Sequence, residues 1–175
     1  MNDETSETLN LGQAVSNTLS VHYSQKSDIW RTPPDLYARL NEEFGPFNLD
    51  VAASDDNALC ERYFTEEQDA LIQDWGAGVC FCNPPYSKLY PFVAKAYEES
   101  LKGATVVMLI PSRTDTRAFH QFIFGKAEIR FLKGRLRFSN APHPAPFPSC
   151  VVIMRPPPMA TTDVPEASSE PPFDS

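Results

Sequence analysis

The sequence predicts one α/β domain, with a mostly parallel sheet and antiparallel edge strands at its C-terminal end. Two patterns indicate this fold class. Apolar strand-like runs alternate with helical stretches through most of the chain, and several strand-like stretches then follow one another. The chain has 175 residues, of which 42% are hydrophobic and 11% aromatic. These values are typical of a single folded globular domain.

The first elements are predicted from apolar spacing. Residues 33–44 begin with two prolines and place apolar side chains at every fourth position, which predicts an amphipathic helix. A glycine-proline pair follows and predicts its end. The short apolar run 47–53 ends in small residues and is typical of a buried strand. The pattern of residues 57–75 is mixed, and we interpret it as two short helices.

The middle of the chain continues the alternation. Residues 79–82 form an apolar strand, and residues 88–101 have the spacing of a helix. Residues 105–111 are the clearest buried strand of the chain. A helix is expected over 115–124, with Asp115 as its N-cap. The three strand-like stretches AEIRFLKG, RLRFSN and SCVVIMR complete the sheet, and a proline-rich loop separates the last two.

The domain is expected to comprise residues 23–155. Residues 1–22 and 156–175 are polar and acidic, and the second of these tails also contains six prolines. Such segments cannot bury enough apolar surface to fold, so both are predicted to be disordered.

The formal net charge of −8 is unevenly distributed along the chain. Residues 23–101 carry 6 basic and 14 acidic side chains, whereas residues 102–155 carry 9 basic and 2 acidic ones. An asymmetry of this kind indicates a surface that faces a polyanion. The alternative is an ordinary solvated surface, and charge alone does not decide between them.

Neither a metal site nor a membrane segment is expected. The four cysteines include no C-x-x-C pair and the three histidines are scattered, which argues against zinc. Cys80 and Cys82 are two residues apart on a predicted strand, so both should point to the same face as buried thiols. The longest apolar run is far shorter than the roughly 20 residues of a membrane span.

The sequence Asn83-Pro84-Pro85-Tyr86 directly follows a predicted strand, where open α/β sheets bind ligands. Two prolines fix the backbone and remove two N–H donors. The Asn83 side-chain oxygen and the Pro84 carbonyl then remain as acceptors beside the aromatic ring of Tyr86. This set suits a flat group with an exocyclic NH2. The alternative is a turn that merely ends a strand.

These residues resemble motif IV of the amino-methyltransferases, the (N/D/S)-P-P-(Y/F/W) loop that holds a base amino group for methylation by S-adenosylmethionine. The chain as a whole resembles the phage-type DNA N-6-adenine methyltransferase (Dam-like) family over residues 27–154. The matching stretches, in order, are IWRTPPDLY (29–37), FNLDVAAS (47–54), NALCERYFT (57–65), QDALIQDW (68–75), FCNPPYS (81–87), LIPSRTDT (109–116) and GRLRF (134–138).

The resemblance implies a set of residues that contact S-adenosylmethionine. They are Trp30, Thr32, Pro33, Asp50, Ala52, Ala53 and Asp69. Asp50 would lie near the methionine ammonium and Asp69 near the adenine of the cofactor. A helix cap is the alternative role for Thr32 and for Asp69. The chain has no G-x-G after Asp50, which departs from the general methyltransferase pattern.

The resemblance also implies a Rossmann-like methyltransferase fold, and spacing predicts that it is trimmed. Only 33 residues separate Asp50 from Asn83, too few for the two strand–helix units usually found there. No long insertion offers a separate target-recognition domain. Sequence reading would therefore fall to short loops such as residues 112–118 and 139–148.

The implied activity is methyl transfer to N6 of adenine in double-stranded DNA, by in-line attack of a flipped-out base held at Asn83, Pro84, Pro85 and Tyr86. The candidate phosphate contacts are Arg113, Arg117, Lys133, Arg135 and Arg137. For Arg135 and Arg137 a solvated strand face is the alternative. Other open functions are methylation of cytosine N4, an RNA base or a protein glutamine, or a non-catalytic DNA-binding module. The expected location is the cytoplasm of a bacterial host, with the protein encoded by a phage or prophage.

Overall fold

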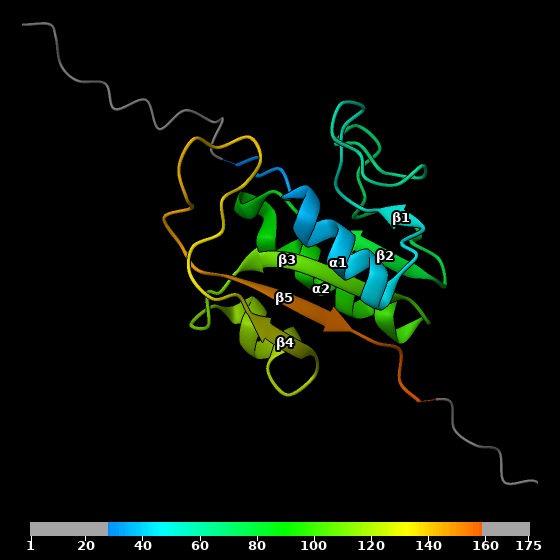
Figure 1. The fold of residues 1–175 in the computed structure, drawn as a ribbon. Helices are drawn as coiled ribbons and strands as arrows, with labels where there is room; N and C mark the ends of the chain where they lie inside the picture. Colours follow the sequence, from blue (N-terminus) through cyan, green and yellow to red (C-terminus); the bar gives the residue numbers. More distant parts are fainter. Residues whose placement is uncertain (1–27, 159–175) are drawn as a thin grey trace, which may run out of the picture.

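The structure is a computed structural model, and it describes residues 28–158. Its strands are β1 (Leu49–Asp50), β2 (Val79–Cys82), β3 (Thr105–Pro111), β4 (Glu128–Phe131) and β5 (Ser149–Met154). They form one sheet in the order β1-β2-β3-β5-β4 (Figure 1). The first three strands are parallel, and β5 runs antiparallel to both of its neighbours. The predicted α/β class, with parallel strands first and antiparallel strands last, is confirmed.

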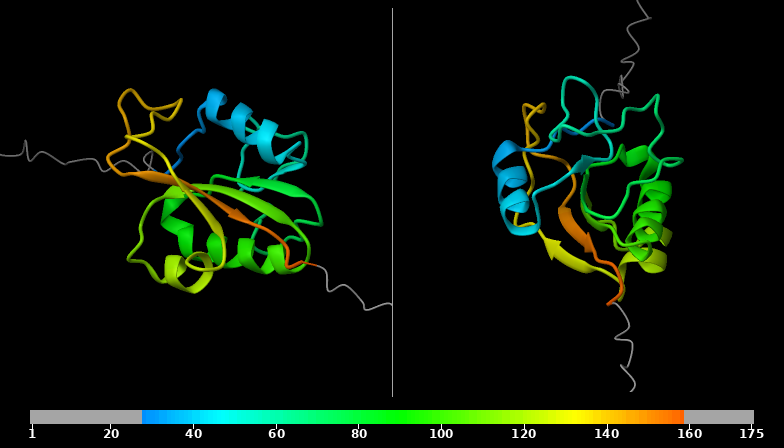
Figure 2. Two further views of the ribbon diagram at one scale, coloured as in Figure 1. Left: turned by 60° about the horizontal axis from the view of Figure 1, so that its bottom comes forward. Right: turned by 90° about the vertical axis from the view of Figure 1, so that its right-hand side faces the viewer.

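Helices cover both faces of the sheet (Figure 2). Helix α1 (Pro34–Phe44) lies on one face, while α2 (Leu89–Leu101) and the short helix η3 (Phe119–Ile123) lie on the other. A single turn, η2 (Tyr86–Lys88), precedes α2. Gly103 separates α2 from β3 with a φ of +117°, a conformation that side-chain-bearing residues rarely adopt. The domain therefore has three layers.

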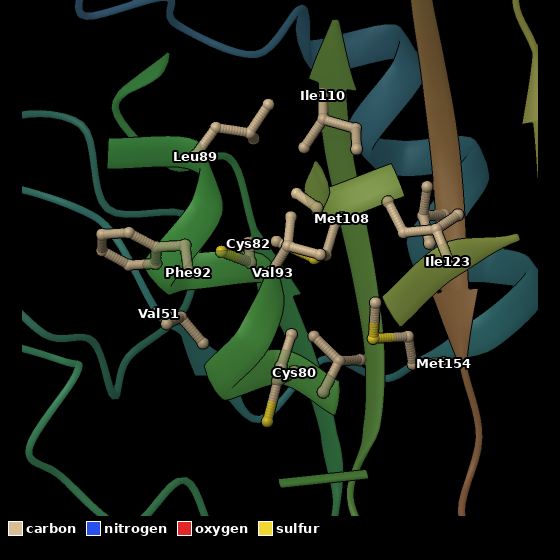
Figure 3. Packing of buried hydrophobic residues seen from close by; sticks show 14 of the residues in the cluster. Val51, Cys80, Cys82, Leu89, Phe92, Val93, Met108, Ile110, Ile123 and Met154 are labelled. Atoms are coloured by element: carbon tan, nitrogen blue, oxygen red, sulfur yellow. The ribbon is translucent and has the colours of Figure 1, made fainter. Parts of the chain in front are cut away.

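Alternation along the strands divides the core in two. Phe81 points toward α1, where it packs with Leu36 and Leu40. Its neighbours Cys80 and Cys82 point the other way, into the cluster formed with α2 (Figure 3). Both thiols are free and buried, and burial raises their pKa. The prediction that both share one buried face is confirmed, because side chains two apart on a strand share a face.

Two of the predicted elements near β1 differ from the structure. The expected strand 47–53 is reduced to two residues. The two short helices expected within 57–75 are absent, and turns take their place. The reason is a backbone link to β1: Asp50 N–H donates to the Arg62 carbonyl, and Phe64 N–H donates to the Asp50 carbonyl, both at 3.0 Å. These bonds hold residues 62–64 extended beside the sheet.

In the last third of the chain one further prediction is wrong, and another is confirmed only in part. Residues 135–138 are not a strand, because their backbone carbonyls bond to a loop: the Leu136 carbonyl accepts the Ala145 N–H at 2.8 Å, and the Phe138 carbonyl accepts the Ala141 N–H at 3.1 Å. The helix expected over 115–124 is confined to a short helical stretch from residue 117 to 123. Asp115 does not cap it, and Thr116 Oγ1 accepts the Phe119 N–H instead at 3.4 Å. The expected tail 1–22 lies outside the described residues, as do residues 159–175 of the expected tail 156–175.

Between residues 28 and 158, no helix is long and apolar enough to cross a membrane. The same residues contain no group of three or more His, Cys, Asp or Glu side chains placed to hold a metal ion.

Candidate active site

Asp50 and Asn83 lie at the same edge of the sheet. β1 and β2 are parallel neighbours, with Asp50 in register with Phe81. The Val51 N–H donates to the Phe81 carbonyl at 2.9 Å. The carboxyl ends of parallel strands form the usual ligand-binding edge of open α/β sheets. Two candidate residues that are 33 positions apart in sequence are thereby brought to one site.

The side-chain amide of Asn83 has a fixed orientation. Its Nδ2 donates to the Trp30 carbonyl and, at 3.0 Å, to Thr32 Oγ1. A backbone carbonyl accepts but cannot donate, so the NH2 end of the amide must face Trp30. Both amide hydrogens are then used. Oδ1 is left as an acceptor, and no hydrogen bond among residues 28–158 involves it.

The two prolines after Asn83 shape the rest of the loop. The Pro85 carbonyl accepts the Lys88 N–H at 2.9 Å and starts the turn η2. The Pro84 carbonyl receives no such bond from the described residues. The loop thus presents two free acceptors close together, the Asn83 Oδ1 and the Pro84 carbonyl.

Asp28 anchors the far end of this loop. Its carboxylate accepts the Ser87 N–H at 2.8 Å and the Ser87 hydroxyl at 2.6 Å. Thr32, 7% exposed, is bonded to Asn83 and does not cap a helix. Helix α1 has Pro33 at its N-cap position and no side-chain cap bond. The capping alternative for Thr32 is therefore wrong.

Four aromatic rings cluster at the loop, namely Tyr86 of the loop itself and Trp30, Phe138 and Phe147 from other segments. Trp30 packs against Phe138 and Phe147, with ring centroids 5.0 and 5.3 Å apart. Tyr86 meets Phe147 edge-on at 5.5 Å and Phe138 at 6.4 Å. Tyr86 is 6% exposed, and burial raises the pKa of its phenol. No partner for the Tyr86 hydroxyl is found in the part of the chain that the structure describes.

Asp50 is a buried carboxylate, 3% exposed. Its Oδ2 accepts the Leu59 N–H at 3.1 Å. No basic side chain forms an ion pair with it in residues 28–158. Burial raises its pKa to about 6, although backbone hydrogen bonds from Leu59 and Ala52 oppose the shift. A buried acid without a cation is a site at which a bound cation is favoured.

The other candidate cofactor residues flank this edge. Ala52 and Ala53 follow β1 and are half-buried, and the Ala53 N–H donates to the Phe64 carbonyl at 3.0 Å. Asp69 is exposed, with a φ of +51°. Its Oδ1 accepts the Leu71 N–H at 3.1 Å in a local turn. No helix follows Asp69, so the alternative role as a helix N-cap is wrong.

The strand directions place the candidate phosphate contacts. β4 is antiparallel to β5, which is antiparallel to β3, so β4 and β3 run the same way. Side chains that follow either strand therefore lie at the Asn83 edge. They are Arg113 and Arg117 after β3, and Lys133, Arg135 and Arg137 after β4. All five are exposed.

Unlike several other basic residues, these five cations form no ion pair within residues 28–158. The ion pairs of residues 28–158 use Arg31, Lys88, Lys95, Lys102, Arg130 and Arg155, and none of the five. Arg117 lies over the Tyr90 ring at 4.9 Å, and Arg137 donates to the Pro142 carbonyl at 2.8 Å. Their charges are thus not neutralised by carboxylates in this part of the chain.

Several residues that build the site were not named individually from the sequence, although the loop 139–148 was expected to read the DNA sequence. They are Asp28, Phe138, Ser139, Asn140 and Phe147. Each is joined to residues that are distant in sequence, so local patterning carries no signal for them.

Together, the α/β sheet and the acceptor loop at its carboxyl edge define a methyltransferase-like protein. Residues 19–161 match the family model described as DNA N-6-adenine-methyltransferase (Dam). Because this match covers most of the chain, the protein belongs to that family.

Individual relatives agree with the family match. The chain is 34% identical over 110 residues to a DNA N-6-adenine-methyltransferase of Escherichia phage T1, over 62% of this chain and 46% of the relative. It is 34% identical over 116 residues to one of Haemophilus phage HP1, over 65% and 67% of the two chains. A putative methyltransferase of Escherichia coli K12, YfdM, is 45% identical over 65 residues, or 34% of this chain and 71% of the relative. The match thus spans about half of the phage T1 protein.

Proposed function

We propose that the protein transfers a methyl group from S-adenosylmethionine to the N6 amino group of adenine in double-stranded DNA. Family membership supports this reaction class. The observation that carries the assignment to an amino group is the orientation of Asn83. Its NH2 end is held by the Trp30 carbonyl and Thr32, which leaves an acceptor pair of Asn83 Oδ1 and the Pro84 carbonyl.

Two acceptors suit an exocyclic NH2, which has two hydrogens to donate. The amino nitrogen of adenine is a weak nucleophile because its lone pair is delocalised into the ring. Hydrogen bonds to Asn83 and Pro84 would localise that lone pair and fix its direction. These residues would contribute positioning and electrostatic stabilisation, and Pro85 keeps their backbone rigid.

The residues at the β1 edge support binding of a cationic cofactor. The buried carboxylate of Asp50, which forms no ion pair within residues 28–158, suits an ammonium group, and the two residues proposed beside it, Ala52 and Ala53, have small side chains. Trp30 and Thr32 accept hydrogen bonds from the Asn83 side chain, and Pro33 follows them in sequence, so we include all three among the proposed cofactor contacts. Asp69 is proposed as an additional contact. Bound S-adenosylmethionine would supply the methyl group.

A base within a duplex is stacked and cannot reach Asn83, so the proposal requires base flipping. Tyr86 would stack on the extruded base. Because this ring is 6% exposed, access to it requires the outward movement of a neighbouring side chain. Phe147 is half-buried and lies on a surface loop, so it is our candidate. Arg113, Arg117, Lys133, Arg135 and Arg137 would contact the phosphates.

The decisive test is methyl transfer from labelled S-adenosylmethionine to unmethylated duplex DNA, followed by digestion and identification of the modified nucleoside. The proposal expects N6-methyladenine. Label found in N4-methylcytosine, or in RNA or a glutamine-containing peptide offered as substrate, would support methylation of another amine. DNA binding with no transfer to any of these would support a non-catalytic module. The bacterial host cytoplasm and the phage or prophage origin remain part of the proposal.

Variants at Asn83 test the role of its side chain. Asn83→Ala is expected to lower methyl transfer about 100-fold, since a positioned polar group at a reacting centre typically contributes this much. Calorimetry should still detect S-adenosylmethionine binding, with affinity within about threefold of wild type. Asn48→Ala is the matched control, because Asn48 is exposed at the opposite end of β1. Activity retained in Asn83→Ala would refute the role.

A further inference from the structure

Residues 28–32, which we call the strap, lie between two loops that are distant in sequence. In Figure 1 the strap is the blue start of the described chain, beside the yellow-to-orange segment that leads into β5. On one side the strap bonds the 83–87 loop, through the Trp30 carbonyl, Thr32 Oγ1 and the Asp28 carboxylate. On its other side it bonds residues 139 and 140.

The second side of the strap is held chiefly by Asn140. Its Oδ1 accepts the Arg31 N–H at 2.9 Å, and its Nδ2 donates to the Ile29 carbonyl at 2.8 Å. This side chain thus makes the pair of bonds that a neighbouring β-strand would make. The Arg31 carbonyl is satisfied separately, by the Ser139 N–H at 3.0 Å and the Ser139 hydroxyl at 3.2 Å.

Along the strap, successive backbone groups bond alternately to residues 139–140 and to Asn83, which links these two segments. Backbone groups of Ile29 and Arg31 bond Ser139 and Asn140, while the intervening Trp30 carbonyl points the opposite way to Asn83. This alternation is that of an extended chain. Because the Trp30 carbonyl determines which end of the Asn83 amide faces the site, any motion of the strap changes the aim of Asn83 Oδ1.

We propose that Asn140 is a positioning residue that holds the Asn83 amide in its reactive orientation through the strap. This inference rests on the function proposed above. Asn140 lies three residues after Arg137, on the same segment as the exposed basic residues Lys133 and Arg135. The strap therefore links the segment proposed to bind phosphates to the acceptor that receives the target amino group.

The contact itself is tested without activity, by amide hydrogen exchange and side-chain NMR of the full chain. Asn140→Ala should accelerate exchange of the Arg31 N–H at least tenfold and shift the side-chain NH2 resonances of Asn83. Asn140→Asp retains an acceptor for the Arg31 N–H, so it should protect that amide better than alanine does. Ser139→Ala is the matched control, because its backbone N–H still serves the Arg31 carbonyl.

The coupling is tested by single-turnover methyl transfer to duplex DNA. Asn140→Ala should lower the transfer rate by about tenfold or more, as a misaligned reacting group does. The DNA concentration that gives half-maximal transfer and the affinity for S-adenosylmethionine should stay within about threefold of the wild-type values. Asn140→Asp should fall between alanine and wild type, and Ser139→Ala should resemble wild type.

Each result has one meaning. Unchanged Arg31 exchange in Asn140→Ala would overturn the strap contact. Faster exchange with unchanged Asn83 resonances, or with an unchanged transfer rate, would overturn the coupling. If wild-type protein methylates no substrate, the proposed function fails; the Asn83 resonances would still show whether Asn140 orients this amide.

Discussion

At the scale of single residues, Asp50 has the least usual environment in the site. A buried carboxylate normally pairs with a cation, because an isolated buried charge is costly. Within residues 28–158 Asp50 has only backbone donors, and its pKa rises to about 6. For the unliganded protein, a folded-state pKa above the unfolded value means that stability falls as pH rises from about 4 to 6. A bound ammonium group would remove this cost.

Cofactor affinity is therefore expected to depend on pH. As pH falls below about 6, Asp50 becomes protonated and S-adenosylmethionine should bind more weakly, approaching tenfold per pH unit. The nearby Tyr37 and Cys60 have raised pKa values and stay neutral in this range. Calorimetry between pH 5 and 7 checks this. Asp50→Asn should bind weakly with little pH dependence; the same slope in both proteins would exclude Asp50 from the cofactor site.

At the scale of elements, Glu99 joins α2 to the segment that precedes β2. It is 1% exposed and accepts hydrogen bonds from Lys95 at 2.7 Å, Lys102 at 2.8 Å and the Trp75 N–H at 3.1 Å. Burial alone would raise its pKa, but these three donors outweigh burial and hold it below its usual range. Trp75 in turn donates through Nε1 to the Ala70 carbonyl at 2.8 Å. Glu99 thus helps to fix the turns around Asp69.

A depressed folded-state pKa contributes stability above the unfolded value of about 4.5, and this is lost as pH falls further. Glu99→Gln should lower the free energy of unfolding at pH 7 by about 3 kcal/mol, because it leaves buried donors poorly paired. The loss of stability between pH 5 and 3 should also become shallower. Urea unfolding at several pH values measures both effects. Glu98→Gln, an exposed neighbour, should change neither.

At the scale of the whole molecule, the strand directions bring five exposed cations to one edge of the sheet. The exposed cations that follow β3 and β4 lie at the same edge as Asn83, whereas residues that precede these strands lie at the opposite edge. A net charge of −8 argues against DNA only if it is spread evenly. In the structure, the edge of the sheet that carries the site has cations that pair with no carboxylate of the described residues.

Neutralising Lys133, Arg135 and Arg137 together should weaken DNA binding and flatten its dependence on salt. Each lost phosphate contact reduces the slope of log K against log salt by about 0.9, so three contacts would reduce it by nearly 3. Titration of fluorescent duplex DNA from 50 to 200 mM salt measures the slope. Lys126→Ala, which precedes β4 at the far edge, should keep the wild-type slope. An unchanged slope in the triple variant would remove these residues from the interface.

The sequence was sufficient for the elements with strong local patterns. Helices over 33–44 and 88–101 and the strands around residues 79–82 and 105–111 were predicted nearly to their ends. The spacing of their apolar residues places one face toward the core, and this spacing can be recognised within a short stretch of sequence. The residues 57–75 and 135–140 were misassigned, because distant backbone partners determine their conformation.

The sequence by itself also determined the acceptor loop at Asn83, since two prolines after a strand leave the backbone few options. Only the tertiary structure decided which end of the Asn83 amide faces the site, because its partners lie 51 and 53 residues away. The same holds for Asn140, which is 109 residues from Arg31. Hydrogen bonds between such distant groups are specified by the packed fold, and no local pattern encodes them.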